Sequence, residues 1–138
     1  MTFRVVNFGT EPLQYAITPT VLTENAETKG DYGNVQVYFA TQTSRDITAQ
    51  TTWTTNCANN VVTVPAKGSA DVTVTVKLSD ALRKELTDTF ENGIYIEGYI
   101  TLKQQATAEG VTGCNLSIPY LAFYGDWDQA PVIDIGYY

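Results

Sequence analysis

Apolar and polar residues alternate with a period of two along the second half of the chain. Between residues 72 and 78, valines and a leucine occupy the even positions, while threonines and a lysine occupy the odd ones. The alternation returns between residues 94 and 102, where isoleucines and a leucine share a face opposite Tyr95, Glu97 and Tyr99. Because successive side chains of a strand point to opposite faces, both segments are predicted to be strands with one buried and one solvated face.

The first half of the chain shows the same alternation less regularly. Three strands are predicted there, at residues 3–8, 13–22 and 35–39. Residues 23–34 are polar and contain glycine, which predicts a loop. Residues 41–60 are rich in threonine and have only Ile47 and Trp53 as large apolar side chains. One or two strands are expected in that segment, without defined bounds.

A single short helix is predicted after residue 78. Ser79 or Asp80 can cap its N-terminus, and Leu82 and Leu86 would lie one turn apart on the same side. A short strand is predicted at residues 62–64. Turn or loop signals separate the other predicted elements at residues 9–12, 65–69, 92–93 and 104–113.

The last predicted strand leads into an aromatic turn. Residues 118–124 are apolar and aromatic, as expected of a buried strand, and the strand ends at the turn signal of Gly125. Trp127 follows between two aspartates, which suggests a ring folded back over the end of the core. Residues 126–138 are predicted to form an exit linker or a last edge strand.

Strands separated by turns, with only one short helix, predict an all-β protein built as an antiparallel sandwich. The chain has 138 residues, which is enough for one domain with a substantial core. No internal repeat or boundary divides it. Residues 1–138 are therefore expected to form a single domain.

Charge and chemistry exclude several functional classes. The net charge is −7 without any basic run, so nucleic acid is not expected as a partner. No apolar stretch reaches the roughly 20 residues of a membrane helix, so no membrane insertion is expected. Histidine is absent, which removes Ser-His-Asp and Cys-His mechanisms and histidine-based zinc sites. No cofactor and no catalytic activity are expected of this chain.

Two groups of residues have alternative interpretations. Cys57 and Cys114 can form a disulfide, which would close a loop of about 57 residues and contribute about 4 kcal/mol in the chain-entropy model, or they can remain unpaired thiols. Asp126, Asp128 and Asp134 offer oxygen ligands for calcium, but their spacing matches no EF-hand. Solvated carboxylates in a turn are the favoured interpretation, so no metal site is predicted.

The aromatic residues near the end of the chain suggest an interaction surface. Tyr124, Asp126 and Trp127 are the predicted residues for docking a neighbouring domain, because aromatic side chains concentrate in interface cores. Tyr120 and Phe123 are expected instead to close the bottom of the sandwich. A carbohydrate-binding surface, with tryptophans 53 and 127 and exposed tyrosines as stacking platforms, is the competing interpretation.

Three segments in the second half of the chain also resemble one known family, in the same order. They are the hairpin at residues 62–76, the strand at 92–100 and the closing stretch at 118–133, which reads Ile-Pro-Tyr-Leu-Ala-Phe-Tyr-Gly-Asp-Trp and then Ala-Pro-Val-Ile. They resemble the fibronectin type III-like domain of subtilisin-like cell-envelope proteinases, of the lactocepin and streptococcal complement-cleaving types. The first half resembles this domain weakly, through Val5 to Asn7 and Tyr15.

This resemblance implies a fibronectin type III or immunoglobulin-like sandwich without activity of its own. It implies an accessory domain of a secreted or wall-attached subtilisin-like serine protease, which packs against the catalytic domain and positions it or its substrate. The expected partners are neighbouring domains of the same polypeptide, namely the catalytic domain and further sandwiches. The expected location is extracellular, at the cell wall. The alternative is a stand-alone adhesive or carbohydrate-binding surface module.

Overall fold

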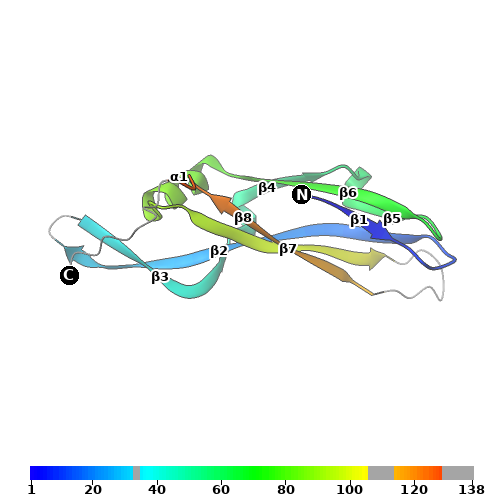
Figure 1. The fold of residues 1–138 in the computed structure, drawn as a ribbon, viewed down its shortest axis with the longest axis horizontal. Coiled ribbons are helices and arrows are strands. Elements are labelled where there is room, and N and C mark those ends of the chain that lie inside the picture. The colour runs from blue at the N-terminus through cyan, green and yellow to red at the C-terminus, as the bar shows by residue number, and fades with distance from the viewer. Residues whose placement is uncertain (33–34, 106–113, 129–138) are drawn as a thin grey trace.

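Two antiparallel sheets make up the part of the chain that the structure, a computed structural model, describes: residues 1–32, 35–105 and 114–128. The smaller sheet has three strands in the order β1-β6-β4. Their bounds are Thr2–Val6 for β1, Ser69–Leu78 for β6 and Thr51–Thr55 for β4. Figure 1 shows this sheet stacked over the larger one along an elongated body. The predicted antiparallel sandwich is confirmed.

The larger sheet has five strands with β2 near its middle. On one edge β2 pairs with β7, which pairs in turn with β8. On its other edge β2 pairs directly with two strands, with β5 near its start and with β3 further along. The bounds are β2 Leu13–Tyr32, β3 Val35–Asp46, β5 Val61–Val64, β7 Ile94–Gln105 and β8 Leu116–Tyr124. Short 3₁₀ turns flank β4 on both sides, η1 at Thr48–Gln50 and η2 at Ala58–Asn60.

The predicted helix is present as α1, Asp80–Thr89. The Ser79 hydroxyl accepts a hydrogen bond from the Leu82 backbone N–H at 3.2 Å, which satisfies one of the free donors of the first turn. Leu82 and Leu86 are both buried, and such burial stabilises by about 1.5–3 kcal/mol per side chain. Arg45 of β3 forms an ion pair with Glu85, so α1 is tied to the larger sheet.

The core consists of two clusters along the sandwich. The first lies between the sheets on the β1 side and contains Val5, Tyr15, Ile17, Val62, Val64, Val72, Val74, Ile100 and Leu102. The second lies under α1 and contains Val21, Ile47, Leu82, Leu86, Ile94 and Ile96. Alternate positions of β7 supply residues to both clusters, as its period of two predicts.

Gly98 makes room for a contact that closes the core. A Cβ at this position would lie 1.9 Å from the carbonyl oxygen of Thr20 on the paired strand β2 and 2.8 Å from the Tyr120 hydroxyl. That hydroxyl donates a hydrogen bond of 2.9 Å to the same Thr20 oxygen. Burial raises the pKa of the Tyr120 hydroxyl. Tyr120 therefore closes the sandwich, as its place in the last strand predicted.

The loop predicted at residues 23–34 is wrong for the residues that the structure describes. Strand β2 continues to Tyr32 and pairs with β3 as a long hairpin that extends past α1 in Figure 1. The register shifts between Glu24 and Ala26 and again between Thr28 and Asp31, so the ladder contains irregularities. Cross-strand hydrogen bonding overrides the weak strand propensity of these polar residues.

Some predictions lie outside the described residues. They concern the greater part of the loop predicted at 104–113 and the linker or edge strand at 126–138, of which the structure describes only residues 126–128. Asp134 also lies outside. Residues 41–60, where one or two strands were expected, contain the end of β3 and all of β4.

Candidate docking surface

The outer face of β7 and β8 presents large apolar side chains to solvent. In this ladder Tyr95 lies opposite Phe123, Glu97 opposite Leu121, and Tyr99 opposite Pro119. Leu121 is 66% exposed, and Tyr95 and Tyr99 are each 49% exposed. Isolated exposed apolar residues are ordinary, whereas a contiguous group is a candidate interaction or ligand-binding site.

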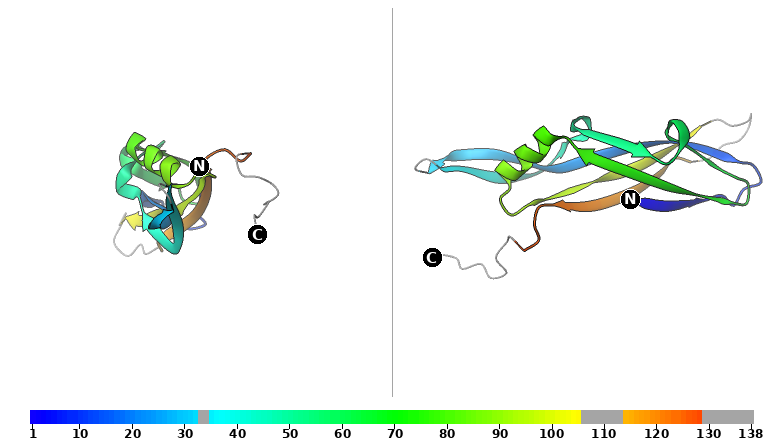
Figure 2. Two further views of the ribbon diagram at one scale, coloured as in Figure 1. Left: turned by 90° about the vertical axis from the view of Figure 1, so that its left-hand side faces the viewer. Right: turned by 90° about the horizontal axis from the view of Figure 1, so that it is seen from above.

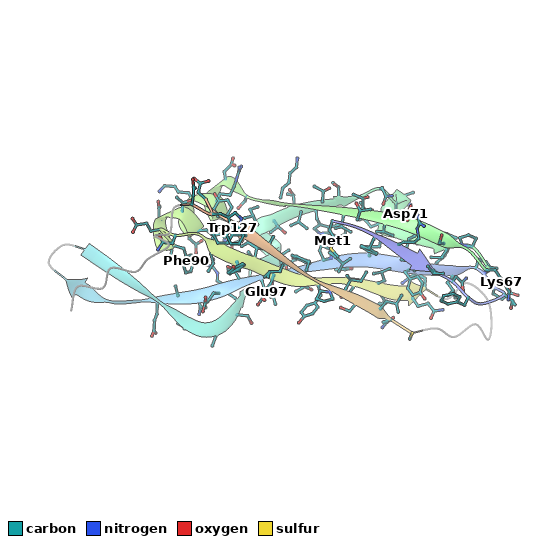
Figure 3. The ribbon with its side chains drawn as sticks, in the orientation of Figure 1. Met1, Lys67, Asp71, Phe90, Glu97 and Trp127 are labelled. Carbon is teal, nitrogen blue, oxygen red and sulfur yellow. The ribbon has the colours of Figure 1, made fainter. Side chains whose placement is uncertain are left out.

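Trp127 folds back onto this face after the end of β8. Its ring stacks on Phe123 with a centroid distance of 4.1 Å and an interplanar angle of 25°. It meets Tyr95 edge-on at 6.1 Å, and Tyr95 meets Phe123 edge-on at 5.4 Å. Figure 3 shows Trp127 beside the end of β8, near α1. Tyr95, Tyr99, Leu121, Phe123 and Trp127 are called the aromatic face below.

The turn that places Trp127 depends on two glycines. Gly125 has a φ of 138°, and a Cβ there would lie 2.7 Å from the Gly93 Cα. Gly93 has a φ of 82° and lies in the turn that precedes β7. Because the two turns touch, the chain reverses tightly at Gly125 and brings the indole over Phe123. Trp127 remains 70% exposed after this stacking.

The three residues predicted for docking lie in different environments. Trp127 belongs to the aromatic face, and Asp126 is exposed beside it. Tyr124 instead points toward α1, where its hydroxyl lies 3.5 Å from the Thr87 hydroxyl and 3.4 Å from the Arg83 carbonyl oxygen. It also lines a cavity of about 320 Å³ between α1 and the end of β8. Its side chain therefore supports the helix rather than the aromatic face.

Sequence reasoning missed several members of the aromatic face. Phe123 was expected to close the sandwich, but it is half-buried under Trp127 on the outer side. Tyr95, Tyr99 and Leu121 were not predicted as docking residues. The signal that could have found them is the period of two itself, since they occupy the positions that alternate with the core residues of β7 and β8.

The charges around the aromatic face are acidic. Glu97 is exposed in the middle of the outer ladder, and Asp126 and Asp128 flank Trp127 in the turn. An apolar surface with one acidic residue in its middle and two at one end is complementary to an apolar surface that carries basic residues.

The two cysteines are free thiols in this structure. The half-buried Cys57 packs against the first core cluster, and its thiol lies 3.4 Å from the Asn56 side-chain oxygen. Cys114 is exposed, just before β8. Burial raises the pKa of the Tyr15 hydroxyl, and proximity to Cys114 raises it further. A bridge between Cys57 and Cys114 stays a prediction.

The two tryptophans do not share one surface. Trp53 lies opposite Val76 in the β4–β6 ladder, so it occupies the face of the smaller sheet that Val76 turns toward the core. It is half-buried, whereas Trp127 is largely exposed. The pairing of these two rings as sugar platforms therefore has no geometric basis in this fold.

Within the described residues, no group of three or more His, Cys, Asp or Glu side chains is placed to hold a metal ion. The ranges 1–32, 35–105 and 114–128 also contain no helix with the length and apolar character needed to span a membrane.

Comparison with known families identifies the sandwich. The model of the Fn3-like domain matches residues 1–121. The chain belongs to the Fn3-like domain family. The match includes the first half of the chain, where the residues alone gave only a weak resemblance. The family predicted from the second half is confirmed.

Proteins with similar sequences are peptidases and proteinases. The C5a peptidase of Streptococcus pyogenes serotype M1 is 33% identical over 73 residues, which cover 53% of this chain and 6% of that protein. The PI-type and PII-type proteinases of Lactococcus lactis subsp. cremoris are each 29% identical over 77 residues, which cover 56% of this chain and 3% of those proteins. The chain thus matches a small part of each relative.

Proposed function

We propose that this chain is a non-catalytic accessory domain of a secreted or cell-wall-attached subtilisin-like serine protease, and that its aromatic face packs against a neighbouring domain of the same polypeptide. The observation that carries this proposal is the exposed cluster in which Trp127 stacks on Phe123 and meets Tyr95 edge-on. Leu121 and Tyr99 extend this cluster along the sheet. The kinship with peptidases and proteinases many times longer than the matched segment supports it.

The aromatic face has the physical properties of a docking surface. Its members stand on two paired strands of the larger sheet, so their positions are fixed by the ladder. A rigid face loses little side-chain entropy when it binds, which leaves more of the apolar burial as affinity. Trp and Tyr are also the residue types most often found at interface hot spots. The accessory role is then mechanical, because a sandwich held at this face fixes the position of the catalytic domain or the path by which the substrate reaches it.

Substitution of Trp127 tests the docking role. In a two-piece experiment, the purified domain is titrated with the catalytic domain of its parent protease and the Kd is measured by calorimetry. Trp127→Ala should weaken binding by about 30-fold or more, because removing a hot-spot tryptophan costs about 2 kcal/mol or more. Phe8→Ala is the matched control, since Phe8 is 86% exposed in the turn between β1 and β2, away from α1. Equal Kd values for both variants would overturn the proposal.

A carbohydrate-binding module is the competing function, and one observation favours it. The rings of Trp127 and Tyr95 are both accessible on one face, and exposed rings can stack on sugars. A glycan array distinguishes the two functions. The docking role predicts no signal above background for the wild type, whereas a sugar-binding module would give a signal that Trp127→Ala abolishes.

A further inference from the structure

Strand β2 parts from β7 near the beginning of β7. The two strands pair up to Thr23, which lies opposite Ile96, and beyond that point β2 pairs with β3 alone among the described strands. The β2–β3 hairpin then continues past α1, as Figure 2 shows in the view from above. The Thr23 hydroxyl donates a hydrogen bond of 3.1 Å to the Tyr95 carbonyl oxygen. This bond ties β2 to β7 at the point where the ladder between them ends.

A polar pocket of about 300 Å³ lies where the two strands part. Its lining includes Glu24, Tyr95 and Glu97, together with the hydroxyl-bearing residues Thr23, Thr43 and Ser44. Glu97 lies opposite Leu22 in the β2–β7 ladder, and Leu22 and Glu24 alternate with the buried Val21 and Thr23. Both carboxylates therefore belong to the outer face of the larger sheet. The pocket adjoins the aromatic face, because Tyr95 is part of both.

The two carboxylates of this pocket have no basic partner. In the part of the chain that the structure describes, neither Glu24 nor Glu97 forms a salt bridge. Arg45 of β3 lies opposite Thr23, but its guanidinium is bound to Glu85 of α1 and to Gln50. Two negative charges that line one pocket repel each other, so both attract a positive charge placed between them.

The pocket also has the size for the head of a basic side chain. A cavity of about 150 Å³ holds a benzene ring, and a guanidinium is smaller than that ring. The Tyr95 ring, which is 49% exposed, offers a π face beside the carboxylates, and a cation over such a ring is attracted to it. Size, charge and the aromatic wall are thus all suited to one kind of group.

We propose that the surface that docks on the aromatic face carries an arginine, whose guanidinium enters this pocket between Glu24 and Glu97 and lies against the Tyr95 ring. This inference rests on the proposed docking role and names the chemistry of the partner. Arginine fits better than lysine, because a planar guanidinium stacks on aromatic rings and is more weakly hydrated than an ammonium. It also binds a carboxylate through two parallel hydrogen bonds.

The arginine would add selectivity to the apolar contact. Apolar burial against Trp127 is non-directional, so by itself it does not choose between apolar partners. A pocket with two carboxylates rejects a partner that places an acidic side chain there, because like charges brought together at an interface are costly. The domain is therefore expected to accept a partner face with an arginine next to apolar residues and to reject an acidic one.

Substitutions that remove one charge and keep the shape test the pocket. The domain is titrated with the catalytic domain of its parent protease, and the Kd is measured at low and high NaCl concentration. Glu24→Gln and Glu97→Gln should each weaken binding about tenfold at low salt, and both should reduce the salt dependence of the Kd, because salt screens the lost attraction. Glu11→Gln is the matched control, since it removes the same charge from the exposed turn between β1 and β2.

The Trp127→Ala variant separates this inference from the docking role. It should weaken binding and leave the salt dependence as in the wild type, since it removes no charge. If Trp127→Ala weakens binding while both glutamine variants behave as Glu11→Gln does, the arginine is ruled out and the docking role stands. If only the glutamine variants weaken binding, the pocket keeps its role and docking through the tryptophan is ruled out. Wild-type affinity in all of these variants would overturn both.

A small probe tests the choice of arginine without the catalytic domain. The backbone amide signals of Tyr95 and Glu97 are followed by NMR while N-acetyl-arginine amide is added, with the lysine and the uncharged citrulline compounds as controls. Saturable shifts are expected with the arginine compound, weaker ones with the lysine compound and none with citrulline. Glu97→Gln should remove the response to arginine. Equal shifts with all three compounds, or no shift with any of them, would contradict the proposal.

Discussion

The two faces of the β7–β8 ladder are built from the same strands, but one is buried in the core and the other is exposed to solvent. On the inner face, Ile100 and Leu102 are 1% and 0% exposed and belong to the first core cluster. On the outer face, Tyr99 and Leu121 are 49% and 66% exposed. Both faces carry large apolar or aromatic side chains, although Glu97 also lies on the outer face. Folding buries the inner side chains in the core, whereas the outer ones leave apolar surface that this domain alone does not cover.

The largest loss of stability is expected from a substitution on the inner face. Leu102→Ala should lower the free energy of unfolding by about 2–5 kcal/mol, because it removes buried methyl groups and leaves a cavity. Leu121→Ala removes the same atoms from the outer face and should change it by less than about 0.5 kcal/mol. Urea denaturation of both variants measures the difference. If the two substitutions cost the same, the assignment of the faces is wrong.

A smaller loss of stability is expected from a substitution at Gly98, where the inner face has no side chain. Gly98→Ala places a Cβ against the Thr20 carbonyl, so the β2–β7 ladder or the Tyr120 hydrogen bond must give way. The expected loss of stability is about 2–3 kcal/mol, from strain and overpacking. Glu97→Ala, one residue earlier on the outer face, is the control and should be nearly neutral. Thermal unfolding followed by circular dichroism measures both variants, and a neutral Gly98→Ala would contradict the close approach.

The strands and the helix were predictable where local pattern and tertiary packing agree. The alternation at residues 94–102 and the cap at Ser79 each specify an element through their own chemistry. The extension of β2 to Tyr32 was not predictable in this way. Its residues are polar and contain glycine, and they become a strand because β3 supplies the partner backbone. Pairing of this kind depends on contacts distant in sequence, which local propensity does not encode.

The aromatic face was only partly predictable for a related reason. Trp127 stood out because a large ring between two carboxylates after a strand needs an explanation. Tyr95, which meets its ring edge-on, lies 32 positions earlier in the chain and reaches it only through the β7–β8 pairing. Conversely, Tyr124 is a neighbour of Trp127 in sequence but points toward α1. Proximity along the chain thus selected one residue that belongs to the face and one that does not.

In the proposed function, a neighbouring domain of the parent protein covers the aromatic face. Hydroxyl-radical footprinting with mass spectrometry tests it directly, by comparing oxidation of Trp127, Tyr95 and Phe8 in the isolated domain and in the longer protein. The account predicts that oxidation of Trp127 and Tyr95 falls by about tenfold in the longer protein, since docked hot spots exclude water, while that of Phe8 is unchanged. Equal oxidation of Trp127 in the two proteins would contradict it.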